Sequence, residues 1–175
     1  DAIGECYDKV ARVIGLEYPG GPKIDKLAKD GKPTYKLPVP LKDDSYNFSF
    51  SGLKSAVINL AHNEEQRGNP IREADLAASF QNVAVEAILT KVRKAITDKG
   101  IKHMILAGGV AANSCLRDRL ELECKNKEIN FSYPRIAYCT DNAAMIGAAA
   151  YYANRKGIVA DLELNAVAVD TLYNE

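Results

Sequence analysis

The sequence predicts an α/β fold, because two short strand-like runs each lead through a turn directly into a helix. The first run covers residues 104–106. Gly108 and Gly109 turn the chain, and Asn113 then begins a helical segment with leucines on one face. A glycine turn between a strand and a helix lets the backbone approach a ligand closely. Many such turns carry glycines only to reverse the chain, so this run alone leaves both interpretations open.

A second strand-to-helix turn follows the first. We expect a strand over residues 136–139, with Thr140, Asp141 and Asn142 capping a helix over residues 143–155. Asp141 occupies the position where α/β sheets commonly present catalytic and ligand groups. The same residue type is also favoured as a plain N-cap. Taken together, one glycine-rich and one acidic turn favour a cleft for a nucleotide and a cation.

Composition sets limits on the class of protein. The chain has 175 residues with 47% hydrophobic content, enough for one domain or two small ones with a real core. Lys plus Arg and Asp plus Glu are each 23, so the chain is not a generic basic nucleic-acid binder, although a local patch or a partner could still hold a nucleic acid. No run is apolar enough for a membrane helix.

Cysteine and histidine usage argues for a cytosolic protein without a zinc site. The four cysteines are scattered and form no Cys-x-x-Cys pair, which is typical of reduced, buried thiols. Both histidines are isolated as well, so a zinc cluster is not expected. These residues are Cys6, Cys115, Cys124, Cys139, His62 and His103.

The first quarter of the chain predicts a helix, a turn and a second, short helix. Apolar residues at helical spacing predict a helix from residue 3 that ends near Gly15. Residues 18–22 read Tyr-Pro-Gly-Gly-Pro, a turn by composition. The amides of Gly20 and Gly21, near the carboxylate of Asp25, could hold a hydroxylated ligand or could simply belong to a structural turn.

Three further elements are expected before the first glycine turn. Prolines restrict residues 31–44 to an edge strand or an ordered loop. Residues 47–50 predict a strand that turns at Ser51 into a helix. The longest helix is expected over residues 71–99, where an apolar stripe indicates core packing and not a cofactor site.

Five sequence strings together resemble one known family. The chain is similar to the C-terminal half of the universal tRNA threonylcarbamoyladenosine transferases, earlier described as O-sialoglycoprotein endopeptidases. The strings occur in the family's order and extend over nearly the whole chain. They are DAIGECYDK at residues 1–9, YPGGP at 18–22, FSFSGLK at 48–54, GGVAAN at 108–113 and YCTDNAAMI at 138–146.

The resemblance implies an actin-like ATPase fold of two lobes around a cleft. Residues 1–175 would be the C-terminal portion, mainly the second lobe with helical additions, and the N-terminal lobe would lie outside this sequence. The family transfers a threonylcarbamoyl group from threonylcarbamoyl-adenylate to the exocyclic amine of the adenosine beside the anticodon. Its substrates are tRNAs that read codons beginning with A.

The resemblance also implies site residues. Asp8, Gly21 and Asp25 would line the site for the acyl-adenylate or for ATP and ADP, and Asn113 would hydrogen-bond the nucleotide. Asp141 would be a ligand of a divalent metal ion, iron by resemblance, with zinc and magnesium as alternatives. No residue is identified as a catalytic base.

The chemistry expected from this resemblance is direct acyl transfer. A mixed anhydride needs its carbonyl polarised and its adenylate leaving group neutralised. The chain offers no nucleophile paired with its own base, which favours direct attack by the tRNA amine. The family's two metal-binding histidines belong to a His-x-x-x-His motif in the N-terminal half, and neither His62 nor His103 matches it. We therefore expect this chain alone to bind metal poorly and to be inactive.

Two alternatives remain at the level of sequence. One is a small-molecule kinase or ATPase of the same superfamily, which would need a general base for a hydroxyl group. The other is a non-catalytic scaffold paralogue, which would be expected to lack Asp141 and the Pro-Gly-Gly-Pro turn. A metalloprotease is the weakest reading, since the chain has no His-Glu-x-x-His motif. The resemblance implies a cytoplasmic protein with four partners: tRNA, an actin-like paralogue in a heterodimer, a small P-loop ATPase and the threonylcarbamoyl-AMP synthase.

Overall fold

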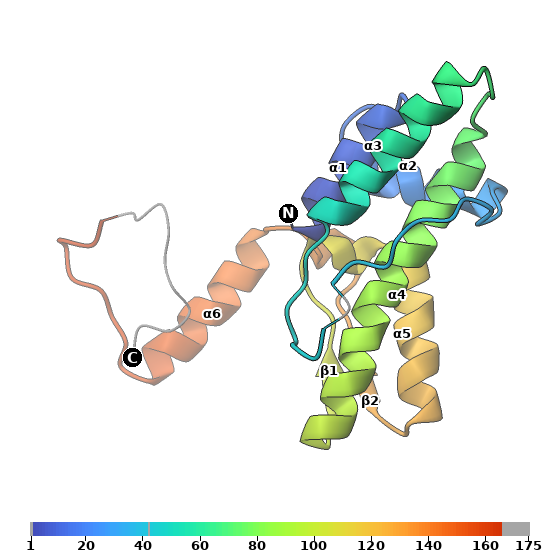
Figure 1. Ribbon diagram of the computed structural model, residues 1–175. Coiled ribbons are helices and arrows are strands. Elements are labelled where there is room, and N and C mark those ends of the chain that lie inside the picture. Colours follow the sequence, from blue (N-terminus) through green and yellow to red (C-terminus); the bar gives the residue numbers. More distant parts are fainter. Residues whose placement is uncertain (1, 42, 166–175) are drawn as a thin grey trace. The chain divides into compact units, whose positions relative to one another are not determined.

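A computed structural model describes residues 2–41 and 43–165, and it divides the chain into two units between Thr140 and Asp141. Figure 1 labels the main elements. In chain order they are α1 (Ile3–Val13), α2 (Gly20–Leu27), the 3₁₀ turn η1 (Ala28–Asp30), α3 (Ser51–Gln66), α4 (Glu73–Lys99), β1 (His103–Ile105), η2 (Gly109–Ala112), α5 (Ser114–Asn126), β2 (Asn130–Ser132), η3 (Ile136–Tyr138) and α6 (Ala143–Arg155).

Helix α4 is the central element of the first unit, and α2, α3 and α5 all contact it (Figure 1). It has 27 residues, and seven consecutive residues from Asp75 to Gln81 are all buried. Burial of every face over two turns means that neighbours surround this part of the helix. Gly100 ends α4 in the left-handed conformation at φ 60°, where glycine is favoured. The helix predicted over residues 71–99 is therefore confirmed, with its start two residues later.

The main core lies where α1, α2 and α3 meet the first half of α4. Tyr7 of α1 and Phe80 of α4 make an edge-to-face contact with ring centroids 4.8 Å apart. Both residues are almost fully buried, so this contact fixes α1 against α4. The buried members of this core are Cys6, Tyr7, Val10, Ala11, Ile14, Ile24, Phe50, Leu53, Val57, Leu76, Ala77, Phe80, Ala84 and Ala87.

The second half of α4 packs on a β-α-β unit. Strands β1 and β2 pair in parallel, with Met104 opposite Phe131, and α5 connects them. Leu116 and Leu120 of α5 pack against Val85 and Leu89 of α4. This unit confirms the α/β expectation for the first strand-to-helix turn. The sequence analysis did not identify β2.

Two predicted strands are wrong. Residues 47–50 are irregular, and residues 136–138 form the 3₁₀ turn η3 where a strand was expected over 136–139. A strand needs a neighbouring strand to accept and donate its backbone hydrogen bonds. Among the described residues only β1 and β2 form such a ladder, so apolar content alone could not make either segment a strand.

The described part of the proline-containing segment, residues 31–41 and 43–44, is a loop, one of the two forms expected for it. Polar side chains of α4 hold this loop and its continuation. Asp75 accepts a hydrogen bond from the Lys32 amide at 2.7 Å, and Ser79 accepts one from the Tyr35 amide at 3.0 Å. The nearly buried Lys91 donates to the carboxylate and the carbonyl of Asp43. These three contacts explain why an irregular segment is ordered.

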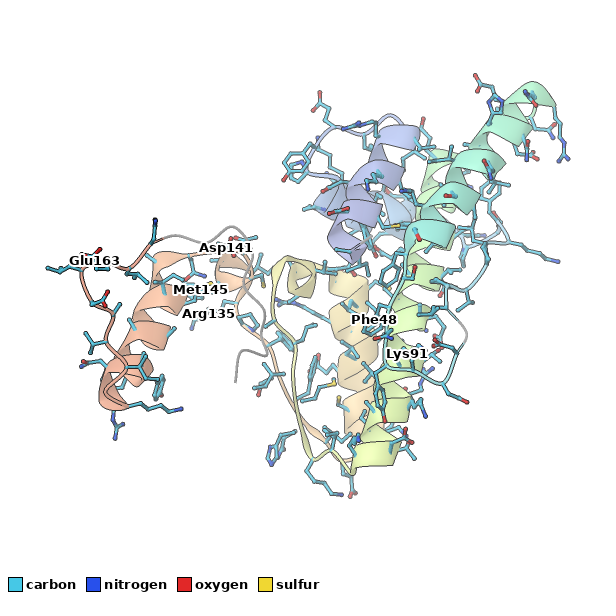
Figure 2. All side chains as sticks on the ribbon, turned by 60° about the vertical axis from the view of Figure 1, so that its left-hand side comes forward. Phe48, Lys91, Arg135, Asp141, Met145 and Glu163 are labelled. Atoms are coloured by element: carbon cyan, nitrogen blue, oxygen red, sulfur yellow. The ribbon has the colours of Figure 1, made fainter. Side chains whose placement is uncertain are left out.

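Figure 2 shows Lys91 beside the part of this loop that carries Phe48. Lys91 also donates to the carbonyl of Ser45 at 2.7 Å, so it joins two points of the loop. Its hydrogen bond lowers the pKa of the Asp43 carboxyl. Several oxygen atoms accept hydrogen bonds from the buried Lys91 ammonium group, so its hydrogen-bonding capacity is satisfied. These bonds hold the segment in place without strand pairing.

The second unit contains α6, which matches the helix predicted over residues 143–155. Asn142 is its N-cap, and the Asn142 side chain accepts a hydrogen bond from the Met145 amide at 3.0 Å. The cap is therefore Asn142 and not Asp141. No helix among the described residues is both long and apolar enough to cross a membrane.

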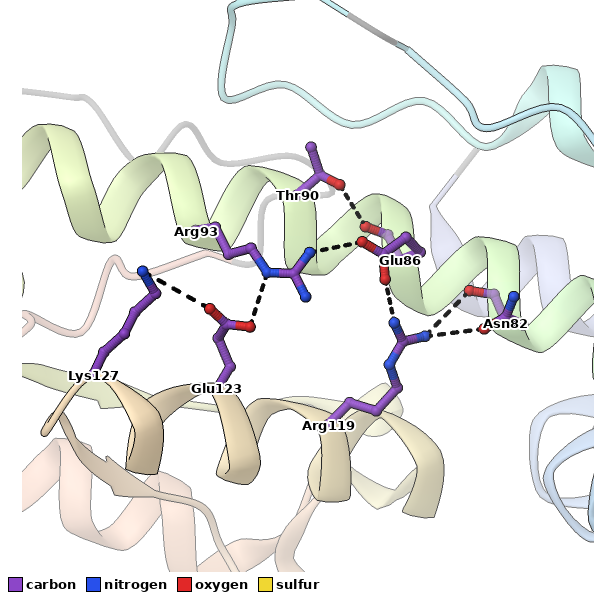
Figure 3. Close-up of polar contacts among 7 residues, drawn as sticks. All are labelled: Asn82, Glu86, Thr90, Arg93, Arg119, Glu123 and Lys127. Atoms are coloured by element: carbon purple, nitrogen blue, oxygen red, sulfur yellow. Dashed lines mark hydrogen bonds and ion pairs between the residues drawn. The ribbon is translucent and has the colours of Figure 1, made fainter.

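An ion-pair network joins α4 to α5 (Figure 3). Glu86 of α4 pairs with Arg93 of the same helix and with Arg119 of α5. Arg93 in turn donates to Glu123 of α5 at 2.8 Å. These side chains are partly exposed, so each pair contributes little by itself, but Glu86 and Arg93 each take part in two pairs.

We predict that Glu86→Gln lowers the free energy of unfolding by roughly 1 kcal/mol, because it weakens two linked pairs at once. The loss should shrink in 1 M salt, where screening is strong. Urea unfolding at low and high salt measures both effects. Glu5→Gln, which disrupts an exposed pair within α1, is the control and should cost less. A salt-independent loss at Glu86 would contradict the electrostatic explanation.

Gly31 provides a test of close packing. A Cβ atom at this position would lie 1.9 Å from the carbonyl oxygen of Ala74 in α4. We predict that Gly31→Ala destabilises the protein by about 3 kcal/mol or more, because backbone atoms must move. Thermal unfolding measures the change. Gly52→Ala is the matched control, since nothing lies within 4 Å of its Cβ position, and equal melting temperatures for the two variants would contradict the packing model.

Candidate functional site

The start of α2 lies tightly against α1. The amide of Gly20 donates a 2.8 Å hydrogen bond to the Asp8 carboxylate. A Cβ atom on Gly20 would lie 2.4 Å from the Cβ of Ala11 and 2.9 Å from the Cα of Asp8, so glycine is required for this approach. Helix α2 already begins at Gly20, so only residues 18 and 19 of the turn predicted over residues 18–22 lie outside a helix.

Gly21 lies next to this contact and is open. No heavy atom comes within 4 Å of the position that its Cβ would occupy. A side chain at Gly21 would therefore meet no packing contact, in contrast to Gly20, whose missing side chain is needed for packing. Of the two glycines considered from sequence, Gly20 donates its amide to Asp8, whereas Gly21 has free space at its Cβ position.

Asp25 connects α2 to the N-terminus of α5. Its two carboxylate oxygens accept hydrogen bonds from the Ser114 amide at 3.1 Å and from the Ser114 hydroxyl at 3.0 Å. A negative charge is favourable at a helix N-terminus, where backbone amides lack partners within the helix. Asp25 therefore fixes α2 against the glycine turn, although the two residues are 89 positions apart in sequence.

Asn113, where the sequence analysis expected a helix to begin, is the N-cap of α5. Its side-chain oxygen accepts from the Leu116 amide at 2.8 Å, and its side-chain nitrogen donates to Gln81 of α4 at 2.9 Å. The residue is only 8% exposed. Both the oxygen and the nitrogen of its carboxamide are thus hydrogen-bonded within the first unit.

Burial suppresses ionisation of the groups around this cluster. It raises the pKa of Tyr7 far above the usual range, so the hydroxyl remains a hydrogen-bond donor. Burial likewise raises the pKa of Cys115, and it raises the pKa of Cys6 to about 11. A thiol with such a pKa is a poor nucleophile at neutral pH. None of these three groups is activated for covalent catalysis.

The site residues expected from sequence divide between the two units. Asp8, Gly21, Asp25 and Asn113 belong to the first unit, where α1, α2 and the start of α5 bring their elements together. Asp141 is the first residue of the second unit and is exposed. It is described with that unit alone.

The residues in hand do not form a metal site by themselves. Within the described parts of the chain, no group of three or more His, Cys, Asp or Glu residues could hold a metal ion. Asp141 supplies one carboxylate, and stable binding needs additional ligands.

Sequence reasoning missed Gln81, Ser114 and Tyr7 as members of this cluster. Gln81 stands out only as an uncharged polar residue within the buried stretch of the longest helix. Ser114 directly follows Asn113, a position with a free helix amide. The burial of Gln81 and the approach of Asp25 to Ser114 depend on packing between distant elements, so spacing along the chain could not reveal them.

The fold and this cluster define a class of protein: an α/β protein with helical additions, in which a glycine-rich strand-to-helix turn and the start of a neighbouring helix form one polar edge. The particular family follows from sequence comparison. The family model for tRNA N6-adenosine threonylcarbamoyltransferase matches residues 1–148. The chain belongs to this family.

Individual relatives agree with the family model. Proteins named tRNA N6-adenosine threonylcarbamoyltransferase from Staphylococcus aureus, strains Newman and bovine RF122, are each 54% identical to this chain over 166 residues. The aligned part is 94% of this chain and 49% of each relative. The chain thus spans about half the length of the curated relatives it matches.

We predict that the 175-residue chain alone binds divalent metal weakly, with a dissociation constant above about 10 µM, because Asp141 is a single carboxylate. Equilibrium dialysis with iron, zinc and magnesium, followed by elemental analysis, measures the stoichiometry. The full-length gene product is the reference. Tight binding of one metal ion per chain to the 175-residue polypeptide would contradict the prediction.

Proposed function

We propose that this chain is the C-terminal portion of a tRNA-modifying acyltransferase. The reaction moves a threonylcarbamoyl group from threonylcarbamoyl-adenylate to the exocyclic amine of the adenosine beside the anticodon. Family membership over residues 1–148 carries this proposal. The cluster around Asp8, Asp25 and Asn113 supports it, because Asp8 bonds the start of α2 and Asp25 of α2 bonds Ser114 beside Asn113.

The proposed fold of the whole protein is the actin-like ATPase fold, with residues 1–175 supplying mainly the second lobe and its helical additions. The parallel pair β1 and β2, connected by α5, is compatible with one edge of such a lobe. In this arrangement the glycine turn before α5 faces the nucleotide. The adenylate would lie beside Gly21 in the first turn of α2, where the position of a Cβ atom is free of neighbouring atoms.

The proposed mechanism is direct attack of the tRNA amine on the carbonyl of the mixed anhydride. The new carbon–nitrogen bond, which completes a urea group, forms as the bond from the carbonyl carbon to the adenylate phosphate oxygen breaks, and AMP leaves with the electron pair. The amine proton passes to solvent or to a base that the sequence does not identify. The raised pKa values of Cys6, Cys115 and Tyr7 support direct attack over an acyl-enzyme intermediate, since none of the three would be an effective nucleophile.

Asp141 is proposed as a ligand of the divalent metal ion, with iron as the metal that the family implies. The proposed partners are tRNA, an actin-like paralogue, a small P-loop ATPase and the threonylcarbamoyl-AMP synthase, all in the cytoplasm. A neutral chain fits a tRNA-binding surface that several subunits build together. No observation favours the small-molecule kinase or the non-catalytic scaffold.

The decisive experiment reconstitutes the full-length gene product with its partners, ATP, threonine, bicarbonate and unmodified tRNA. Mass spectrometry of the nucleosides should detect threonylcarbamoyladenosine. We predict that Asp141→Ala lowers product formation by at least about 10- to 100-fold, because loss of a metal ligand should cost no less than loss of a residue that supports one.

Asp161→Ala is the matched control, since Asp161 is another exposed carboxylate of the second unit. It should leave product formation unchanged. Product from both variants would remove Asp141 from the essential residues and retain the reaction. Absence of product from the wild-type protein, with nucleotide still bound, would contradict the proposed reaction.

A further inference from the structure

Gln81 is a buried polar residue in the middle of α4, and only 5% of it is exposed. Phe80, the neighbouring residue, belongs to the main core. An amide group in such a place must find hydrogen-bond partners, because an unsatisfied buried polar group is costly. The partners of Gln81 come from two different elements, α1 and the turn before α5.

Asn113 is the closer partner. Its Nδ2 atom donates to Oε1 of Gln81 at 2.9 Å, an ordinary length for this bond. The hydroxyl of Tyr7 lies 3.5 Å from the same oxygen, which is long for a hydroxyl donor. The bond to Asn113 is therefore the stronger constraint. Tyr7 places a second donor on the same side of Gln81.

This bond fixes which way the Asn113 carboxamide points. With Nδ2 directed at Gln81, Oδ1 is directed at the Leu116 amide, 2.8 Å away. A rotation that exchanged the two atoms would place a nitrogen against the Leu116 N–H and an oxygen against Oε1. Both bonds would be lost together. Oε1 of Gln81 thus stabilises the orientation in which Asn113 caps α5.

The same helix end carries the bond to α2. Ser114 follows Asn113 and donates both its amide and its hydroxyl to Asp25. A chain of contacts therefore runs from Tyr7 and Gln81 through Asn113 and Ser114 to Asp25. It connects α1, α4, α5 and α2 through polar atoms in or next to the core.

We propose that Gln81 is a positioning residue of the nucleotide-binding edge. By holding the Asn113 carboxamide, it sets the cap of α5 and the placement of the glycine turn relative to Asp25. The proposal rests on the proposed function for its ligand, an adenine nucleotide. Its structural part, the orientation of Asn113, can be measured without any ligand.

The test compares two variants in the full-length gene product. Gln81→Met keeps a similar length and removes the acceptor, whereas Gln81→Glu keeps an acceptor oxygen in either protonation state. Loss of the Oε1 acceptor should lower the hydrogen-exchange protection of the Leu116 amide by about tenfold, since that amide has no acceptor within its own helix. Affinity for ADP, measured by calorimetry, should fall by about tenfold in the same variant. In Gln81→Glu, the hydrogen-exchange protection of the Leu116 amide and the affinity for ADP should both stay close to the wild-type values.

Ser79→Ala is the control for general destabilisation. Ser79 is equally buried on α4, but it holds the Tyr35 amide in the loop and not the glycine turn. It should lower the melting temperature while leaving Leu116 protection and ADP affinity close to wild type. Equal losses of both quantities in Ser79→Ala and Gln81→Met would overturn a specific role for Gln81.

The remaining outcomes separate the two proposals. If Gln81→Met folds and the hydrogen-exchange protection of the Leu116 amide is unchanged, the positioning role is overturned. The role is also overturned if that protection is lost but the affinity for ADP is unchanged. Failure of the wild-type protein to bind ADP rejects the proposed nucleotide site, and the Leu116 exchange then decides the orientation of Asn113. If Gln81→Met does not fold, the wild-type protein gives the answer: rapid solvent exchange of both Asn113 side-chain protons contradicts the bond to Gln81.

Discussion

The burial of α4 on all sides between Asp75 and Gln81 is the constraint on which much of the first unit depends. A helix enclosed over two turns cannot direct its polar residues to solvent, so each must find a partner in a neighbouring segment. Asp75 and Ser79 accept hydrogen bonds from loop amides, and Gln81 accepts one from the Asn113 side chain. Lys91, further along α4, donates to a loop carbonyl. The positions of the proline-containing loop and of the glycine turn follow from these four side chains. Side-chain packing and the hydrogen bonding of buried polar groups therefore together determine these positions.

The functional edge is built by the same principle. Charged and polar groups there serve first as connections between elements: Asp8 holds the start of α2, and Asp25 holds the start of α5. A ligand would therefore meet a surface whose polar groups are already fixed, which lowers the cost of ordering them on binding. Gly21 differs from these residues because it leaves space next to its backbone.

The distribution of glycines illustrates how one residue type serves different physical purposes. Gly20 and Gly31 lie where a Cβ atom would overlap neighbouring atoms, at Ala11 and at Ala74. Gly100 adopts a positive φ and ends α4. Gly21 has neither constraint, so its lack of a side chain is not explained by packing. Gly52, Gly109 and Gly147 share this open environment, so free space alone does not identify a glycine that contacts a ligand.

The sequence by itself determined the helices, the first strand-to-helix turn and the family. Helical periodicity depends only on which residues share a face, and the Asn113 cap is a local signal, so both could be predicted. The five strings placed Asp8, Gly21, Asp25, Asn113 and Asp141 in a proposed site. Only the tertiary structure decided that residues 136–138 form a 3₁₀ turn, because strand formation depends on a partner. It also decided that Gln81 meets Asn113 and that Asp25 meets Ser114, since such contacts between distant residues depend on how helices pack.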